Sequence, residues 1–272
     1  MHKKFMRELA ALGLPVSPGP EVNLAPVTEA DLDPLPDAAR SYLRFMNVVG
    51  RPRDWSFRLG FRGRFRRSQR EPWMRCEAWQ YNTRLALARI FYLQIRFFGF
   101  IPVLGRDTYA DGRGRMLIRV LDLFTVGDGK GEPYDIGELV TYLNDGIMIA
   151  PAMQLVPEVR WAKVDARSFD VAITDHGRTV QARVFVDERG APVNFETTDR
   201  FYSDPQDPTK VTRCRWTTPV AGWQAVGDRQ LPTSGQAVWH PPEGELAYAD
   251  FTFDPSSLAF NVSPGAPAAT SC

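Results

Sequence analysis

The chain has 272 residues, of which 44% are hydrophobic, and its 33 basic and 32 acidic side chains give a net charge of +1. This length and apolar content are typical of a globular chain with a substantial core. The balanced charge provides no global field that would attract nucleic acid or an anionic membrane, so we expect no nucleic-acid partner. The three cysteines, Cys76, Cys214 and Cys272, lack CxxC spacing, which argues against a disulfide framework and against a thiolate zinc site.

Residues 1–50 are expected to form helices joined by a proline-rich connector. Apolar residues at helical spacing predict an amphipathic helix over residues 3–12, and a second helix follows Pro36. Thr28 is a candidate cap for a short helical turn within the connector. The apolar stretch Leu9–Leu14 is shorter than the core of a secretory signal. We therefore expect a cytoplasmic protein without an integral membrane segment.

From Trp55 the hydrophobic period changes to two. Apolar residues over 57–65 alternate with arginines, which predicts a half-buried antiparallel strand with its arginines on one face. That face is either an ordinary solvated surface, which we favour, or a surface that binds anions or another subunit.

The run Ile90–Pro102 carries Gln94 and Arg96 among five aromatic rings. Buried amide and guanidinium groups cost free energy unless they are paired. The run is therefore expected to be a strand with one wet face, or the wall of a ligand pocket. Alternation places Gln94 and Arg96 on the same face as Tyr92 and Phe98, and the sequence leaves open which face lines the cavity.

A dense polar cluster follows directly, over residues 105–112. Alternation places Arg106 and Thr108 on one side of a strand and Asp107 and Tyr109 on the other. Asp107 and Tyr109 form a candidate acid–base pair, because burial raises a carboxyl pKa and a phenol can donate to developing negative charge. The alternative is a strand end at which Asp107 pairs with a neighbouring arginine.

One convincing helix is predicted over residues 136–149, with Asp135 and Glu138 as its capping pair. Glu138, Tyr142 and Asp145 share one face of this helix, and Asn144 and Met148 lie beside that face. Taken alone, such a polar stripe is expected to be solvated, but it lines a cavity if the sheet curves around the helix.

Further strands are expected over residues 169–174, 179–187, 192–198, 212–217, 236–240 and 248–253, with turns at Asp111-Gly112, Asp128-Gly129, His176-Gly177 and Arg189-Gly190. His240 ends one of these strands, and we expect it to have a structural role, with a ligand contact as the alternative. Residues 262–272 are predicted to be a disordered tail.

Four segments in order carry a resemblance to a known family: Leu35–Arg44, Gly105–Gly112, Gly137–Asp145 with Pro151, and Leu231–Trp239 with Tyr248. Together they resemble the bacterial DUF6544 (DUF6920) family over about residues 35–255. The later strands also look like the lipoprotein-carrier (LolA/LolB-like) architecture. This likeness implies an α+β fold: a strongly curved antiparallel half-barrel over residues 51–261, with helices at its N-terminus and over its concave face, and an apolar cavity.

Two functions fit these observations, and we favour the first. It is a cofactor-independent and metal-free lyase or isomerase that acts on an aromatic or hydrophobic small molecule. The alternative is a non-catalytic carrier or sensor of a lipid-like ligand. Association into a homo-oligomer is left open. The candidate catalytic residues are Asp107, Tyr109, Tyr142, Asp145 and Arg106. The candidate ligand contacts are Trp79, Tyr81, Tyr92, Gln94, Arg96, Phe98, Asn144, Met148, Trp239, His240 and Tyr248.

Overall fold

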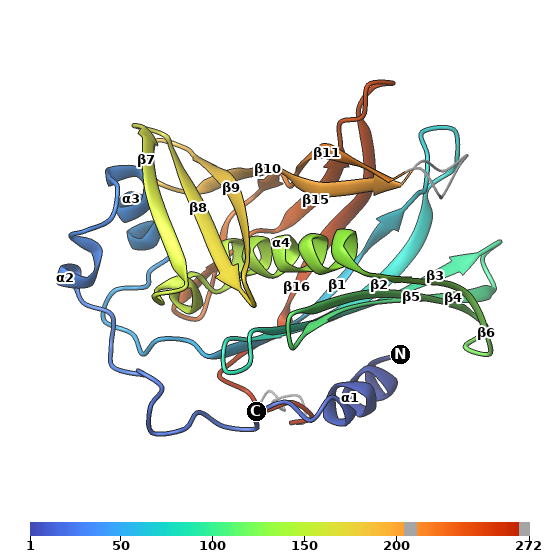
Figure 1. The fold of residues 1–272 in the computed structure, drawn as a ribbon, viewed down its shortest axis with the longest axis horizontal. Coiled ribbons are helices and arrows are strands. Elements are labelled where there is room, and N and C mark those ends of the chain that lie inside the picture. Colours follow the sequence, from blue (N-terminus) through green and yellow to red (C-terminus); the bar gives the residue numbers. More distant parts are fainter. Residues whose placement is uncertain (204–210, 267–272) are drawn as a thin grey trace.

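The computed structural model describes residues 1–203 and 211–266. Most of the described strands form one antiparallel sheet in the order β6-β5-β4-β3-β2-β1-β16-β15-β11-β10-β9-β8-β7. This sheet curls around a single long helix, α4, which lies between its two ends (Figure 1). The predicted α+β half-barrel with a strongly curved antiparallel sheet is therefore confirmed.

The element bounds agree with the first two predicted helices and most predicted strands within one or two residues, whereas α4 begins earlier and β10 and β16 run further. The helices are α1 (His2–Ala11), α2 (Glu29–Leu32), α3 (Asp37–Phe45), α4 (Glu132–Ile149) and the 3₁₀ helix η1 (Pro151–Gln154). The first strands are β1 (Ser56–Phe65), β2 (Met74–Thr83), β3 (Ala88–Phe97), β4 (Ile101–Ala110), β5 (Arg113–Val120) and β6 (Phe124–Lys130). The later strands are β7 (Val159–Asp165), β8 (Ser168–Asp175), β9 (Arg178–Val186), β10 (Pro192–Ser203), β11 (Val211–Thr217), β12 (Val220–Ala221), β13 (Gln224–Val226), β14 (Arg229–Leu231), β15 (Ser234–Trp239) and β16 (Leu246–Phe260).

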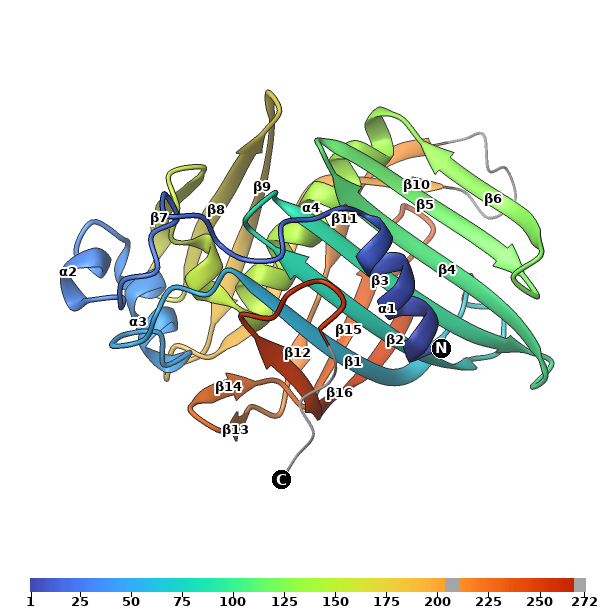
Figure 2. The same ribbon diagram turned by 90° about the horizontal axis from the view of Figure 1, so that it is seen from below.

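Helix α1 covers the outer surface of the sheet, on the side opposite α4. It lies across β2, β3 and β4 in Figure 2. Phe5 and Leu9 are fully buried and pack with Tyr81, Ile90 and Tyr92 in a core separate from the one around α4. The apolar spacing that predicted this helix is therefore the stripe that anchors it to the sheet.

The other N-terminal helices pack into the main core of the half-barrel. Thr28 caps α2 as predicted, since its side chain accepts from the Asp31 amide and the Asp31 side chain accepts from the Thr28 amide. In α3, Tyr42 is fully buried, its ring lies 5.4 Å from that of Phe169, and its hydroxyl donates to the Ile147 carbonyl at 2.6 Å. This bond ties α3 to the last turn of α4.

The alternation predicted for β1 is present. Phe57 and Leu59 are fully buried in the main core, whereas Arg64 on the opposite face is half-exposed and pairs with Asp250 at 2.7 Å. Arg58 departs from the expected solvated face: it is 1% exposed and donates to the Ala266 carbonyl at 2.5 Å. Residues 267–272 of the predicted tail lie outside the described part of the chain.

Three predicted turns are confirmed, and one is wrong. Arg189-Gly190 lies in the β9–β10 turn, where the Gly190 amide donates to the Asp187 carbonyl at 3.0 Å. Asp111-Gly112 and His176-Gly177 each have two successive positive φ angles, as a type I′ hairpin turn requires. Asp128-Gly129 instead lies within β6 and pairs with β5. Gly129 is needed there for a different reason, because a Cβ at this position would collide with the ring of Tyr134.

Helix α4 is longer and more deeply buried than predicted. Its N-cap is Gly131, so the predicted Asp135–Glu138 capping pair is wrong. Asp135 instead accepts from the Gly114 amide at 2.7 Å and from Arg178 at 2.9 Å. Every residue from Asp135 to Ile149 is buried, so the expected solvated face is also wrong. The curved sheet and the neighbouring elements bury the helix, and its polar residues therefore need internal partners.

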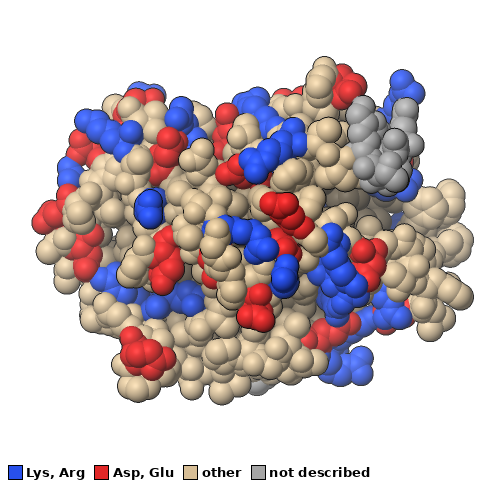
Figure 3. All heavy atoms as spheres, viewed as in Figure 1, with Lys and Arg blue, Asp and Glu red and all other residues tan. Residues whose placement is uncertain are grey.

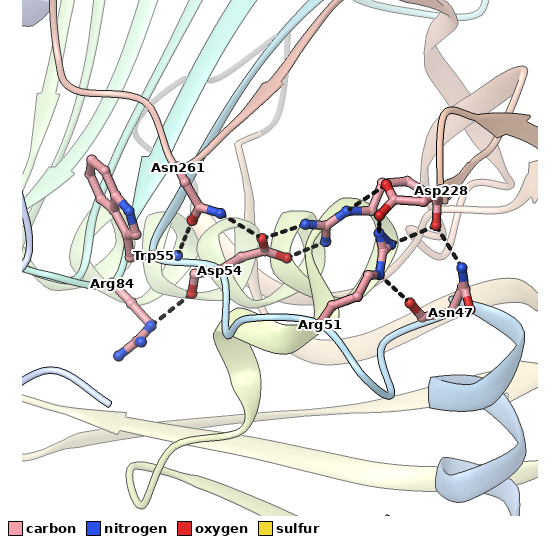
Figure 4. A network of polar contacts seen from close by, with 8 residues as sticks. Asn47, Arg51, Asp54, Trp55, Arg84, Asp228 and Asn261 are labelled. Atoms are coloured by element: carbon pink, nitrogen blue, oxygen red, sulfur yellow. Dashed lines mark hydrogen bonds and ion pairs between the residues drawn. The ribbon is translucent and has the colours of Figure 1, made fainter. Parts of the chain in front are cut away.

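A buried ion network around Asp54 holds distant segments together (Figure 4). Asp54 is fully buried and receives two bonds from Arg229, one of them at 2.7 Å, and a third from Asn261 at 3.2 Å. Its backbone carbonyl accepts from Arg84 at 2.8 Å. Arg51, which comes shortly before Asp54 in the chain, pairs with Asp228 at 2.7 Å. The network therefore joins the start of β1 to β14 and to the end of β16.

The surface agrees with the balanced composition. Figure 3 shows Lys and Arg interspersed with Asp and Glu over the visible face, separated by uncharged residues. No extended patch of one sign covers this face.

Candidate functional site

The two faces of the sheet are distinguished by what covers them. We call the side that contacts α4 the concave face and the side that contacts α1 the outer face. Arg89 of β3 bonds to α4 and Tyr92 packs against α1, so odd-numbered residues of β3 point to the concave face. Directly opposed residues of antiparallel strands share a face, which extends this assignment across the sheet.

A buried ion cluster joins α4 to β3 on the concave face. Arg89 donates through Nη1 to Glu138 Oε2 at 2.7 Å and through Nε to Asp145 Oδ2 at 2.6 Å. All three side chains are almost fully buried. Burial raises the pKa of Glu138 and of Asp145, whereas the Arg89 charge opposes both shifts. One guanidinium therefore bonds to two carboxylates that lie about two turns apart on α4.

Asp107 lies on the same face, opposite Phe91 of β3. Desolvation and the charge of Glu138 raise its pKa to about 7, while Arg89 and Arg200 act in the other direction. Among the described residues, no hydrogen bond ends on its carboxylate. Asp107 is therefore a partly exposed carboxyl that changes protonation near neutral pH, as an acid–base group or a ligand contact requires.

Arg200 of β10 completes the polar group from the opposite wall of the half-barrel. It is 9% exposed, and its guanidinium carbon lies 4.3 Å from the Trp216 ring centroid and 5.3 Å from that of Trp239. Its Nε is buried without a hydrogen-bond partner, and it forms no ion pair with any described residue. Cation–π contacts hold this guanidinium, but they do not replace an anionic partner.

Aromatic rings surround this polar group. Phe61, Phe91, Phe251 and Phe253 form a chain of contacts with centroids 5.1 to 6.1 Å apart. Beside them, Tyr248 stacks on Trp239 at 6.2 Å and accepts a hydrogen bond from the Trp216 indole at 3.2 Å. The concave face therefore combines a wide apolar wall with a few convergent polar groups, the usual composition of a small-molecule site.

Part of this wall is not covered. Gly105 of β4 lies opposite Leu93 and Ile118 on the concave face. A Cβ at Gly105 would meet only Leu93 atoms, at 3.8 and 4.0 Å, and one at Gly127 would meet only Ile118 atoms. There is thus open space over the apolar strands beside Asp107.

Residues 25–251 match a family of unknown function (DUF6544). The chain belongs to the DUF6544 family. No curated protein matches the sequence. The crystal structure of a LolA superfamily protein, NE2245 from Nitrosomonas europaea, aligns with 79% of this chain and 91% of its own length, at 11% sequence identity and a TM-score of 0.42.

Several predicted ligand contacts of this DUF6544 chain lie on the outer face instead. Trp79, Tyr81 and Tyr92 pack around α1, and by alternation Gln94 and Arg96 point to the same side as Tyr92. Arg106 also points outward and donates to Glu8 of α1 at 2.8 Å. These residues therefore do not join Asp107. The physical reason is that α1 uses them as its own docking surface, which the strand pattern alone does not reveal.

Phe98 lies apart from both faces. It occupies the β3–β4 turn with a positive φ and is 75% exposed. Other large exposed apolar residues lie in this turn, in the adjacent β5–β6 turn and at the start of β6: Phe97, Phe100, Leu121, Leu123, Phe124 and Val126. Phe98 is thus part of an apolar hairpin tip and contributes nothing to the concave wall.

The remaining candidates divide between the site and the main core. Asp107, Asp145, Trp239 and Tyr248 come together around Arg89 and Arg200, as described above. Tyr109 shares the side of Asp107 as predicted, but its hydroxyl donates to Asp175 at 2.6 Å instead of facing Asp107. Burial and Asp175 raise the pKa of this phenol, so the hydroxyl stays protonated at neutral pH and is a poor base.

Four further candidates are held by structural contacts. Tyr142 and Met148 are buried in the main core. Asn144 donates to Thr218 at 2.6 Å, and His240 bonds to Thr217 at 2.9 Å beside Glu245. Desolvation lowers the pKa of His240, so the ring is neutral at pH 7. These contacts agree with the structural role expected for this histidine.

Sequence reasoning missed Arg89 and Arg200, the two guanidinium groups of the site. Arg89 precedes the aromatic run by one residue, and its odd position matches the apolar residues Phe91 and Leu93. Arg200 lies beyond the predicted end of its strand, since β10 extends to Ser203. If the strand had been predicted to run as far as Ser203, Arg200 would have appeared as a charged residue within it. That position is the signal that could have identified Arg200.

Neither a metal site nor a spanning helix is found in residues 1–203 and 211–266. No three His, Cys, Asp or Glu side chains gather there as ligands would, and no helix is long and apolar enough to cross a membrane. Cys76 and Cys214 are free thiols, and burial raises the pKa of Cys76 to about 12. Such a thiol is a weak nucleophile at neutral pH.

Proposed function

We propose that this protein binds a mainly apolar small molecule on the concave face of its half-barrel, as a carrier or sensor. The observation that carries the proposal is the open space over Gly105, in the middle of an apolar wall. An uncovered apolar wall of this kind favours a ligand, because apolar surface that is left exposed in a concave face commonly marks a binding site.

The surrounding chemistry supports a ligand with one polar end. Most of the wall is made of aromatic and aliphatic side chains, whereas Asp107 and Arg200 are confined to the part that faces α4. An amphipathic molecule can lay its apolar body along β3 to β6 and direct its polar end to these two residues. Burial of the apolar body would provide most of the binding free energy.

Filling the space tests this proposal. Gly105→Trp places a large ring on the concave wall, where the neighbouring atoms leave room for it, and should abolish binding of the uncharged dye Nile red measured by fluorescence. Val126→Trp is the matched control, because Val126 is 62% exposed and lies at the register shift between β5 and β6, where it has no paired residue on β5. Unchanged dye affinity in Gly105→Trp, with wild-type thermal stability, would contradict the proposal.

Acid–base catalysis of the lyase or isomerase type is a second candidate for the same site. It is favoured by one observation, the pKa of about 7 at Asp107, which suits proton transfer at neutral pH. Asp107→Asn should then abolish turnover of a bound substrate while leaving its affinity within a few-fold. Retained turnover in that variant would exclude Asp107 as the catalytic acid or base.

A further inference from the structure

The two buried guanidinium groups of the site differ in their partners. Arg89 donates to two carboxylates at 2.6 and 2.7 Å. Arg200 is 9% exposed, yet no described carboxylate or carbonyl accepts from it, and its Nε is unpaired. Buried arginines are normally paired, because an unpaired buried charge is strongly unfavourable. Arg200 therefore has N–H groups without an acceptor among the described residues, and an anion could bind to them.

The charges of the cluster favour an anion of low charge. Arg89 and Arg200 contribute two positive charges, and Glu138 and Asp145 contribute two negative charges. Asp107 is protonated for part of the time at pH 7, and in that form it adds a hydrogen-bond donor without adding charge. The cluster is therefore neutral without a ligand, so a monoanion on Arg200 adds one negative charge beside three carboxyl groups and a dianion adds two, which favours the monoanion of the two.

We propose that Arg200 anchors the ligand of this site by receiving its carboxylate group. The assignment rests on the proposed function, since the apolar wall must hold the rest of the molecule. The flat rings of Trp216 and Trp239 fix the guanidinium plane, so that its N–H groups can bind a planar carboxylate through two parallel hydrogen bonds. The predicted ligand class is therefore a carboxylic acid with an apolar body, such as a long-chain or aromatic acid.

Matched twelve-carbon probes test the head group separately from the chain. We expect wild-type protein to bind laurate about 10- to 100-fold more tightly than lauryl alcohol, as a charge-assisted pair implies. Dodecyl phosphate and dodecylammonium should bind more weakly than laurate. Quenching of tryptophan fluorescence at pH 7 reports the affinity, because Trp216 and Trp239 lie against Arg200.

Two substitutions place this preference on Arg200. Arg200→Gln should lower laurate affinity to that of lauryl alcohol, and Arg200→Lys should keep part of the preference, since it retains the charge but not the planar fork. Arg213→Gln is the matched control, because Arg213 lies on the paired strand and already bonds to Asp199 at 2.8 Å. Circular dichroism and thermal melts establish that each variant is folded. If Arg200→Gln does not fold, the Lys variant and the wild-type probe series decide the question.

The outcomes separate the anchor from the proposed function. Equal wild-type affinities for laurate and lauryl alcohol would overturn the anchor and leave apolar binding standing. Tighter binding of dodecyl phosphate or dodecylammonium than of laurate would overturn the carboxylate assignment. Failure of all four probes to bind would overturn the proposed function, and the anchor with it.

Discussion

Two buried ion clusters in this molecule contain the same residue types but differ in how completely their charged groups are paired. In the Asp54 network, the carboxylate is fully buried and receives bonds from Arg229 and Asn261, which come from distant segments (Figure 4). In the cluster between α4 and the sheet, Arg89 is doubly paired, whereas Arg200 has no anionic partner in the described part of the chain and Asp107 has a raised pKa.

The difference indicates what each cluster contributes. When buried donors and acceptors are paired, they hold distant segments in one arrangement, as the Asp54 network does for β1, β14 and the end of β16. A buried guanidinium without an anionic partner, beside a titrating carboxyl, costs stability. Such an arrangement is retained where a binding site needs those groups. We therefore expect substitutions in the first cluster to change stability alone, and substitutions at Arg200 to change binding.

The largest expected effect is that of Arg89→Met. The change leaves Glu138 and Asp145 buried without their counter-ion, so we expect the free energy of unfolding to fall by about 3–5 kcal/mol. Their pKa values are already raised and should rise further. A group whose folded pKa is raised loses stability as pH increases, so the deficit should grow from pH 5 to pH 8. Urea denaturation at both pH values measures it. A loss that is the same at both would show that these carboxylates do not depend on Arg89.

Asp54→Asn should have the next largest effect. It keeps the shape of the side chain but removes the charge that balances Arg229, and we expect a loss of about 2–3 kcal/mol in urea denaturation. Glu188→Ala is the control, because Glu188 is 79% exposed in its pair with Arg167 and should show no measurable change. Laurate affinity of the folded Asp54→Asn protein should equal that of wild type. A specific loss of affinity would remove the distinction between the two clusters.

Alternation and turn residues are local signals, and they were sufficient to predict most elements. The curved sheet was predicted from the resemblance to the lipoprotein-carrier architecture. The face that binds a ligand was not predictable in the same way. Trp79, Tyr81 and Tyr92 looked like a cavity wall, yet they form the seat of α1. In β3 the odd-numbered residues, such as Arg89 and Phe91, face inward, and the even-numbered residues, such as Gln94, face outward. A one-residue change in register would exchange the two faces. That parity is set by which helix docks on which face, an interaction between segments far apart in the chain.

The polar residues of α4 show the same limit. Their spacing was read correctly as one face, but whether that face meets solvent or Arg89 depends on closure of the sheet around the helix. Arg200 lies more than 50 residues further along the chain than Asp145 and reaches the cluster only through the position of β10. The sequence therefore contained the acids of the site in a recognisable pattern, whereas their counter-ions became visible only in three dimensions.

Asp107→Asn has the smallest expected effect, and it should increase the free energy of unfolding, whereas the two variants above lower it. The unfolded chain loses this proton near pH 3.8, whereas the folded protein keeps it until about pH 7, so wild type loses stability as pH rises through that interval. The Asn variant does not titrate and should be more stable than wild type at pH 8, with the difference shrinking towards pH 4. A full shift would correspond to about 4 kcal/mol. Because the carboxyl is partly exposed, we expect on the order of 1–2 kcal/mol. Thermal melts across pH 4–8 measure the difference, and a variant less stable than wild type at pH 8 would mean that the Asp107 carboxylate already has a partner, as Asp54 has.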